Sequence, residues 1–209
     1  MPICPLCQNI STPFYKDEFY ECVCCGGIFR PKEKLLDNQK EKERYESHTN
    51  DSNDLGYQNF VSPITNTVLD EYKKDDLGLD FGCGKDSPIV KVLRQSEYKI
   101  FEYDPYFFDD KKLLEEKYDY IACCEVIEHF YNPKKEFELL KSLLKEKSTL
   151  YLMTGIYRDN IDFSKWWYKN DLTHVFIYRE KTFEWIKEEF GFKNMFIEKN
   201  FISFSNRKE

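Results

Sequence analysis

The residues LGLDFGCG at positions 77–84 decide the fold of this chain. The first five of them, 77–81, are mostly apolar and predict a short buried strand. Gly82 and Gly84 then form a turn, and a helix is expected around residues 87–95. A glycine turn at the carboxyl end of a parallel strand lets the backbone approach a ligand closely. The stretch therefore predicts a strand–turn–helix unit that can hold a small molecule.

Two acidic residues strengthen the prediction of a binding site. Asp80 lies just before Gly82 in the same strand, and Asp104 ends the next predicted strand. A carboxylate at that second place can accept hydrogen bonds from ribose hydroxyls. The main competing fold is a nicotinamide dehydrogenase, whose G-x-G-x-x-G fingerprint needs a glycine where Ser87 stands. Nor does that fingerprint call for an acidic residue two positions before the turn, where this chain has Asp80.

Outward from this unit, apolar runs of strand length alternate with segments of helical periodicity. Such alternation implies a doubly wound, mainly parallel sheet with helices on both faces. Before the sheet, Ser62 is the predicted N-cap of a docking helix, with Pro63 at its first helical position. The other predicted elements are strands at 98–103, 118–124 and 148–154, a helix with Phe137, Leu140 and Leu144 on one stripe, a helix at about 181–190, and a closing strand pair, NMFIE and FISFS.

The composition fits one main globular domain with a small appendage. Of the 209 residues, 41% are hydrophobic and 33% charged, which excludes global disorder. No apolar run approaches the roughly 20 residues of a membrane span, so no membrane partner is expected. The net charge of -7 does not favour nucleic acid, although a local basic patch would allow it. We predict a cysteine-rich unit at 1–30, a linker and connecting helix at 31–61, and the sheet domain at 62–209.

Cysteine spacing predicts a metal site near the N-terminus. Cys4 and Cys7 form one C-x2-C pair and Cys22 and Cys25 a second, with the segment 8–21 between the pairs. This is the spacing of a four-thiolate zinc ribbon, a closed structural site. Without an export signal we expect a cytoplasmic, reducing compartment, in which clustered cysteines are metal ligands rather than disulfides. Cys24 is a spare thiol or a ligand in place of Cys25.

The motifs together resemble one enzyme family. LDFGCG, Asp104 and the segment YDYIACCEVIEHF at 118–130 are similar to class I S-adenosylmethionine-dependent methyltransferases, over roughly residues 60–209. The resemblance implies that Asp80, Gly82 and Gly84 line the methionine end of S-adenosylmethionine and that Asp104 binds its ribose. Glu125 is also predicted to contact this cofactor. The cysteine pairs are similar to a zinc-ribbon extension of some bacterial members.

Two features depart from the family pattern. Asp86 stands where the family has its third glycine, so the turn is expected to be less tight or differently arranged. Only the short segment 105–117 separates Asp104 from Tyr118. The family's usual third strand is therefore expected to be shortened.

A second acidic cluster follows the predicted strand 118–124. Glu125, Glu128 and His129 would share one face of a helix, and two carboxylates with an imidazole can hold a divalent cation. A similar E-x-x-E-H binds metal in the ubiquinone O-methyltransferases. In small-RNA 2′-O-methyltransferases a later histidine completes the site, and His174 is comparable. The alternative is an ordered role without metal for Glu128 and His129 beside the cofactor.

The predicted catalytic residues are Glu128, His129 and His174. The two strands that precede these histidines are expected to be neighbours, which would bring the rings together, and either ring could accept a proton from a hydroxyl. Trp166 and Trp167 are expected either to stack on a planar acceptor or to pack in the core.

The sequence thus predicts methyl transfer from S-adenosylmethionine to an unidentified acceptor, small or macromolecular, with a hydroxyl as one candidate. The alternative is a zinc-ribbon module that binds RNA or protein and carries an inactive methyltransferase-like domain. His48 is expected to be exposed and without function.

Overall fold

The structure, a computed structural model, describes residues 1–36 and 51–207. Two predictions lie outside the described residues: the exposed position of His48 and most of the connecting helix in the linker. Among the helices that are described, none is long and apolar enough to cross a membrane.

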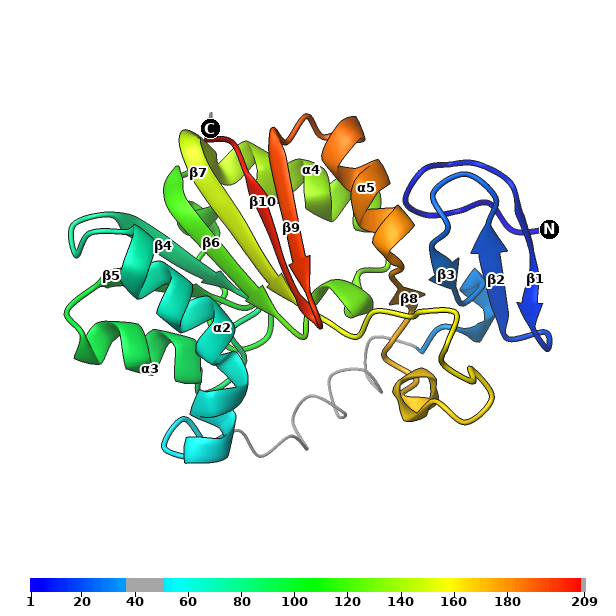
Figure 1. Ribbon diagram of the computed structural model, residues 1–209, viewed down its shortest axis with the longest axis horizontal. Coiled ribbons are helices and arrows are strands. Elements are labelled where there is room, and N and C mark those ends of the chain that lie inside the picture. Colours follow the sequence, from blue (N-terminus) through cyan, green and yellow to red (C-terminus); the bar gives the residue numbers. More distant parts are fainter. Residues whose placement is uncertain (37–50, 208–209) are drawn as a thin grey trace.

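A six-stranded, mainly parallel sheet forms the centre of the large domain, as the alternating pattern predicted (Figure 1). Its strand order is β5-β4-β6-β7-β10-β9. The first four strands pair in parallel, whereas β10 pairs antiparallel with both β7 and β9. The strands are β4 (Leu77–Phe81), β5 (Lys99–Tyr103), β6 (Tyr118–Cys124), β7 (Leu144–Met153), β9 (Asn194–Glu198) and β10 (Phe201–Ser205).

Helices cover both faces of this sheet (Figure 1). Side chains of a strand alternate between the two faces, so Tyr120 of β6 packs in the cluster beneath α2 and α3, while Ile121 packs beneath α4 and α5. Leu144, which we placed on a helical stripe, is instead the first residue of β7. The helices are α2 (Leu55–Glu71), α3 (Pro88–Gln95), α4 (Pro133–Leu143) and α5 (Glu180–Glu189), with short 3-10 turns η1 (Lys32–Lys34), η2 (Lys111–Leu114), η3 (Ile127–His129) and η4 (Trp167–Asn170).

The first helix begins earlier than predicted. Asp54, not Ser62, is the N-cap of α2, and its carboxylate accepts a hydrogen bond from the amide of Tyr57 at 2.7 Å. Pro63 lies inside the helix. Val61 and Ile64 are buried on either side of it, and their packing offsets the cost of an interior proline. The helix therefore includes part of the segment that we predicted as linker.

The family's third strand is absent rather than shortened in the described part of the chain. The sheet ends at β5, and the connection to β6 contains only an Asp104–Phe108 bridge and the turn η2. A parallel crossover by itself already uses a segment of this length. The connection, residues 105–117, is therefore too short for a crossover and an added strand.

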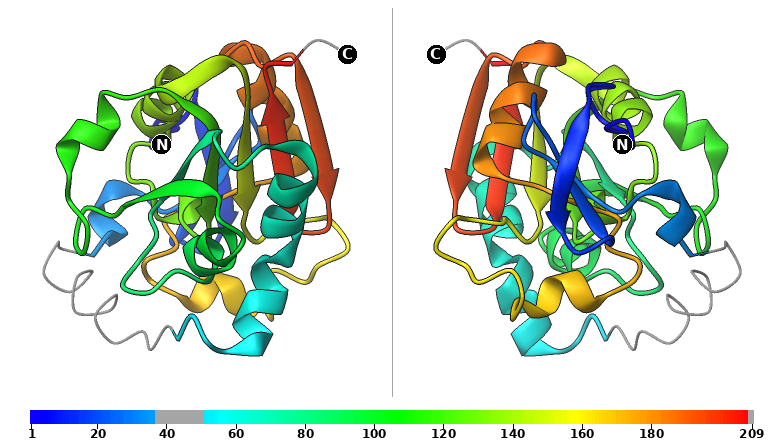
Figure 2. Two further views of the ribbon diagram at one scale, coloured as in Figure 1. Left: turned by 90° about the vertical axis from the view of Figure 1, so that its left-hand side faces the viewer. Right: turned by 90° about the vertical axis from the view of Figure 1, so that its right-hand side faces the viewer.

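The cysteine-rich unit forms a second, small sheet in the order β1-β2-β3-β8 (Figures 1 and 2). Its last strand, β8, comes from the large domain and pairs antiparallel with β3. Gly27 lies so close to this junction that a Cβ there would be 2.2 Å from the ring of Phe176. The two parts thus share a sheet. Its strands are β1 (Ser11–Tyr15), β2 (Phe19–Cys22), β3 (Ile28–Phe29) and β8 (Phe176–Ile177).

Candidate active site

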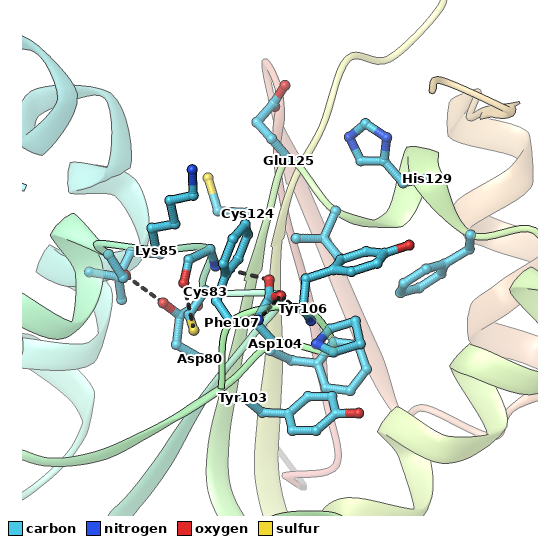
Figure 3. Close-up of a pocket in the computed structure, with 18 of the residues that line it drawn as sticks. Asp80, Cys83, Lys85, Tyr103, Asp104, Tyr106, Phe107, Cys124, Glu125 and His129 are labelled. Atoms are coloured by element: carbon cyan, nitrogen blue, oxygen red, sulfur yellow. Dashed lines mark hydrogen bonds between the residues drawn. The ribbon is translucent and has the colours of Figure 1, made fainter. Parts of the chain in front are cut away.

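A cavity of about 1130 Å³ opens at the carboxyl ends of β4, β5 and β6 (Figure 3). Ligand pockets typically measure roughly 300–1,000 Å³, so this one has room for a cofactor and an acceptor. It runs from Asp104, past the glycine turn, to the two histidines. The predicted site residues that line it are Asp80, Gly82, Gly84, Asp104, Glu125, His129 and His174.

The conformation of the glycine turn is fixed by close packing and by a buried hydrogen bond. Gly82 has a φ of +80°, and a Cβ there would lie 2.5 Å from the side chain of Val126, so only glycine fits. Asp80 accepts a hydrogen bond from the Ser87 hydroxyl at 2.5 Å, and Ser87 in turn caps α3. Burial raises the pKa of Asp80 to about 7.

Asp86 has a structural role that explains the missing third glycine. Its carboxylate accepts a hydrogen bond from the backbone amide of Ser52 at 2.8 Å, and Ser52 is buried just before α2. The turn therefore ties the entry of α2 to the cavity wall, where Asp51 and Asp54 also line the cavity.

Asp104 is fixed at the end of β5 by three backbone amides. One carboxylate oxygen accepts from Gly84 at 3.1 Å, and the other accepts from Tyr106 at 2.8 Å and Phe107 at 3.2 Å. A carboxylate offers about four acceptor positions. Asp104 is therefore rigidly placed and keeps acceptor capacity toward the cavity, where a ribose hydroxyl could donate.

Glu125 and Glu128 occupy different environments, contrary to the predicted shared face. Glu125 has a φ of +52° and precedes η3, so the helical spacing does not apply. Burial and the neighbouring Glu128 raise the pKa of Glu125 to about 9. Glu128 is fully buried and accepts hydrogen bonds from the hydroxyls of Tyr168 at 2.5 Å and Thr154 at 3.0 Å.

The two histidines meet, as predicted. Their ring centroids are 4.9 Å apart. Nδ1 of His129 lies 2.9 Å from the carbonyl of Thr173, and Nδ1 of His174 lies 2.8 Å from the carbonyl of Tyr168. A carbonyl can only accept, so each Nδ1 carries a proton, and in the neutral form of each ring Nε2 is then the acceptor. One ligand atom from each histidine and one from Glu128 lie within 4.8 Å of one another, and Glu125 does not belong to this group.

Sequence reasoning missed the residues that support this cluster. Tyr168 and Thr154 hold Glu128, and their hydroxyls also lie 2.9 Å apart. In the sequence, both could have been noticed: Thr154 is a polar residue at the end of the predicted buried strand 148–154, and Tyr168 belongs to an aromatic run. Of the two tryptophans, Trp167 lines the cavity and is 69% exposed. Trp166 instead packs between Tyr157 and Tyr168.

The four predicted zinc ligands come together in the small sheet. Their sulfurs lie within 4.8 Å of one another, with 3.7 Å between Cys4 and Cys25 and 3.2 Å between Cys7 and Cys22. Zinc–sulfur bonds of about 2.3 Å give a tetrahedron with edges of about 3.8 Å, so the set fits zinc. Cys24 is outside the group.

Comparison with known proteins identifies the large domain. A family model described as a methyltransferase domain matches residues 55–195. The chain belongs to this methyltransferase family. No curated protein sequence matches it significantly.

Solved structures show the same class I methyltransferase fold. A methyltransferase of Archaeoglobus fulgidus, described as SAM dependent, is 19% identical with a TM-score of 0.52, over 78% of this chain and 77% of that one. Human N-acetylserotonin methyltransferase in complex with SAM is 11% identical with a TM-score of 0.55, over 81% of this chain and 56% of the human one. A Burkholderia thailandensis 1,6-didemethyltoxoflavin-N1-methyltransferase is 10% identical with a TM-score of 0.54, over 90% and 97%. This chain therefore spans little more than half the length of the human enzyme.

Three features of the cavity fit S-adenosylmethionine. Asp104 offers a fixed carboxylate to which a ribose could donate, the turn at Gly82 allows close approach of a ligand, and the cavity volume exceeds the range typical of ligand pockets. The individual roles toward the cofactor that we assigned to Asp80, Gly82, Gly84, Asp104 and Glu125 stay predictions.

The zinc site leads to a direct test. Purified protein should contain about one zinc per chain, the stoichiometry of a Cys4 site. Cys22→Ser should lose the metal, whereas the matched variant Cys24→Ser should retain it, because Cys24 lies outside the cluster. Elemental analysis of the three proteins decides the question. Zinc retained by Cys22→Ser and lost by Cys24→Ser would show that the ligand set is wrong.

The raised pKa of Glu125 predicts a pH dependence of stability. An unfolded glutamate has a pKa of about 4.3, and the folded value is about 9, so the folded state holds the proton more tightly. The free energy of unfolding should therefore fall as the pH rises between these values, by at most about 1.4 kcal/mol per pH unit.

Glu125→Gln mimics the protonated carboxyl and should remove that slope. The variant should be more stable than wild type at pH 8, with the gain shrinking toward pH 5, in urea unfolding at both pH values. The exposed Glu146→Gln serves as the control. Parallel pH profiles for wild type and Glu125→Gln would contradict the assignment.

Proposed function

We propose that this chain is a cytoplasmic S-adenosylmethionine-dependent methyltransferase that acts on a hydroxyl group. The observation that carries the proposal is the pair of imidazoles, His129 and His174, whose ring centroids lie 4.9 Å apart and which line the same cavity as Asp104. A cytoplasmic location is supported by the gathering of Cys4, Cys7, Cys22 and Cys25 as metal ligands, an arrangement typical of a reducing compartment.

The cofactor half of the cavity lies along β4 and β5. When bound, S-adenosylmethionine supplies a methyl group on a sulfonium, which is open to attack by an acceptor oxygen. Asp104 would accept hydrogen bonds from its ribose, and the turn at Gly82 would let the methionine end approach the backbone. These residues place the cofactor so that proximity and orientation supply much of the rate.

The acceptor half lies between η3 and the segment around His174. Burial lowers the pKa of His174 below its ordinary value, so the ring is neutral at pH 7 and can accept a proton. His174 Nε2 would take the proton of the acceptor hydroxyl as the acceptor oxygen bonds to the methyl carbon and the bond from that carbon to the sulfonium sulfur breaks. The exposed face of Trp167 offers a stacking surface for a planar acceptor. The net charge of -7 does not favour nucleic acid as that acceptor.

A divalent cation is the second arrangement that the same residues support. Glu128, His129 and His174 offer three ligand atoms within 4.8 Å. The Nδ1–H bonds to backbone carbonyls orient both rings as the outer contacts of metal-bound histidines do. Such an ion would bind the acceptor oxygen and assist its deprotonation. Glu125, which we also predicted as a ligand, lies outside this set.

Cofactor binding can be tested through Asp104. Asp104→Ala should weaken S-adenosylmethionine binding by about 1.5–3 kcal/mol, the range for hydrogen bonds to a charged group. Asp110→Ala, a few residues along the same connection and capping η2, is the matched control and should bind as wild type does. Isothermal titration calorimetry measures both. An unchanged affinity in Asp104→Ala would remove it as the ribose partner, and no binding by wild type would favour the binding-module alternative.

The histidine role is tested by methyl transfer. His174→Ala should reduce transfer of labelled methyl from S-adenosylmethionine to a panel of phenols and other alcohols by about 100-fold or more, as expected for loss of a general base. Its affinity for S-adenosylmethionine should stay as in wild type. If a divalent ion takes part, a chelator that leaves the ribbon zinc in place should abolish transfer and added Mg²⁺ or Mn²⁺ should restore it. Full transfer by His174→Ala would overturn the proposal.

A further inference from the structure

The segment 168–177, which carries His174, is held from two sides. On the side of the large domain, the amide of Val175 donates to the carbonyl of Glu128 at 2.9 Å, and His129 Nδ1 donates to the carbonyl of Thr173 at 2.9 Å. On the other side the segment continues into β8, which pairs with β3 of the zinc ribbon. The ribbon therefore holds the segment that carries His174, although none of residues 1–30 lines the cavity itself.

Arg30, the residue that follows β3, makes the closest link between ribbon and segment. Its backbone amide donates to the carbonyl of Val175 at 2.9 Å. Its side chain donates to the carbonyl of Lys169 through Nη2 at 2.7 Å and to the carbonyl of His174 through Nε at 3.4 Å. Three carbonyls of the segment thus converge on one residue.

The Arg30 side chain is buried between the ribbon and this segment. The residue is 6% exposed, and its guanidinium lies 4.3 Å from the centre of the Phe19 ring. Its ion-pair partner, Glu18, is 3.9 Å away and 47% exposed. A buried guanidinium is costly unless its donors are used, and here the short hydrogen bond goes to a carbonyl of the segment rather than to a carboxylate.

The zinc ligands lie directly before this link. The Cys22 amide donates to the carbonyl of Gly27 at 2.9 Å, and the Gly26 amide donates to the carbonyl of Cys22 at 3.0 Å. Gly27 then contacts the ring of Phe176. The turn that would fold around zinc therefore leads from Cys25 through the short strand β3 to Arg30.

We infer that Arg30 is a positioning residue, through which the zinc-bound ribbon fixes the His174 ring in the acceptor half of the cavity. The ring is fixed because His174 Nδ1 bonds the carbonyl of Tyr168, and Arg30 holds the carbonyl of the next residue, Lys169, and that of His174 itself. The inference rests on the proposed function, in which His174 acts on the acceptor. The cofactor half is built separately, since the bonds to Asp104 come from residues 84–107.

Arg30→Met tests the inference, because methionine keeps an apolar stem over Phe19 and loses every side-chain donor. By hydrogen exchange, the amides of 168–177 should exchange at least tenfold faster than in wild type, while those of 77–104 keep their rates. Methyl transfer should fall at least tenfold in kcat, with the affinity for S-adenosylmethionine unchanged. Cys22→Ser should give the same exchange pattern. Arg158→Ala, which removes a 2.7 Å bond to the carbonyl of Lys199, is the matched control and should leave 168–177 unchanged.

The outcomes separate this inference from the proposed function. Wild-type exchange at 168–177 in Arg30→Met would overturn the inference, as would faster exchange with unchanged transfer while His174→Ala is inactive. If His174→Ala keeps its activity, the proposed function fails, and the exchange data alone then decide whether Arg30 fixes the segment. Should Arg30→Met fail to fold, Arg30→Lys replaces it. Lysine keeps the charge but cannot span both carbonyls, so exchange at 168–177 should still rise.

Discussion

Parallel pairing of β4, β6 and β7 brings the carboxyl ends of these strands to one edge of the sheet, and the rest of the site depends on that register. Asp80 of β4 pairs with Ala122 of β6, and Cys124 pairs with Met153 of β7. The residues that follow, Glu125 and Thr154, are therefore neighbours although a helix and a strand separate them in sequence. A slip of one residue would turn these side chains to the opposite face.

The second constraint is the burial of polar groups at that edge. Glu128 is completely enclosed, so its carboxyl needs partners, and Tyr168 and Thr154 supply them. Tyr168 also accepts the Nδ1–H of His174 through its carbonyl. One tyrosine thus connects the buried carboxyl with the imidazole. The two tryptophans that we expected to act together have different surroundings. Trp166 packs against the cluster on the ribbon side, whereas Trp167 lines the cavity.

Much of the fold could be predicted from the sequence because it depends on local patterns. The apolar runs at 77–81 and 118–124 became strands, and the cysteine spacing brought four sulfurs together. What could not be predicted depends on tertiary contacts. The docking of the ribbon is carried by β8, which is too short to have a periodic signal of its own. The left-handed backbone at Glu125 broke the expected helical spacing, and the burial of Val61 extended α2 past its proline.

We propose that one cavity at the sheet edge binds the cofactor at Asp104 and the acceptor at His174, on a segment that the ribbon holds in place. Hydrogen exchange with and without S-adenosylhomocysteine tests it most directly. We expect protection at residues 82–86, 103–107 and 124–129, where β4, β5 and β6 end, with the ribbon strands 11–22 unchanged. Protection confined to the ribbon, or none at saturating ligand, would contradict the account.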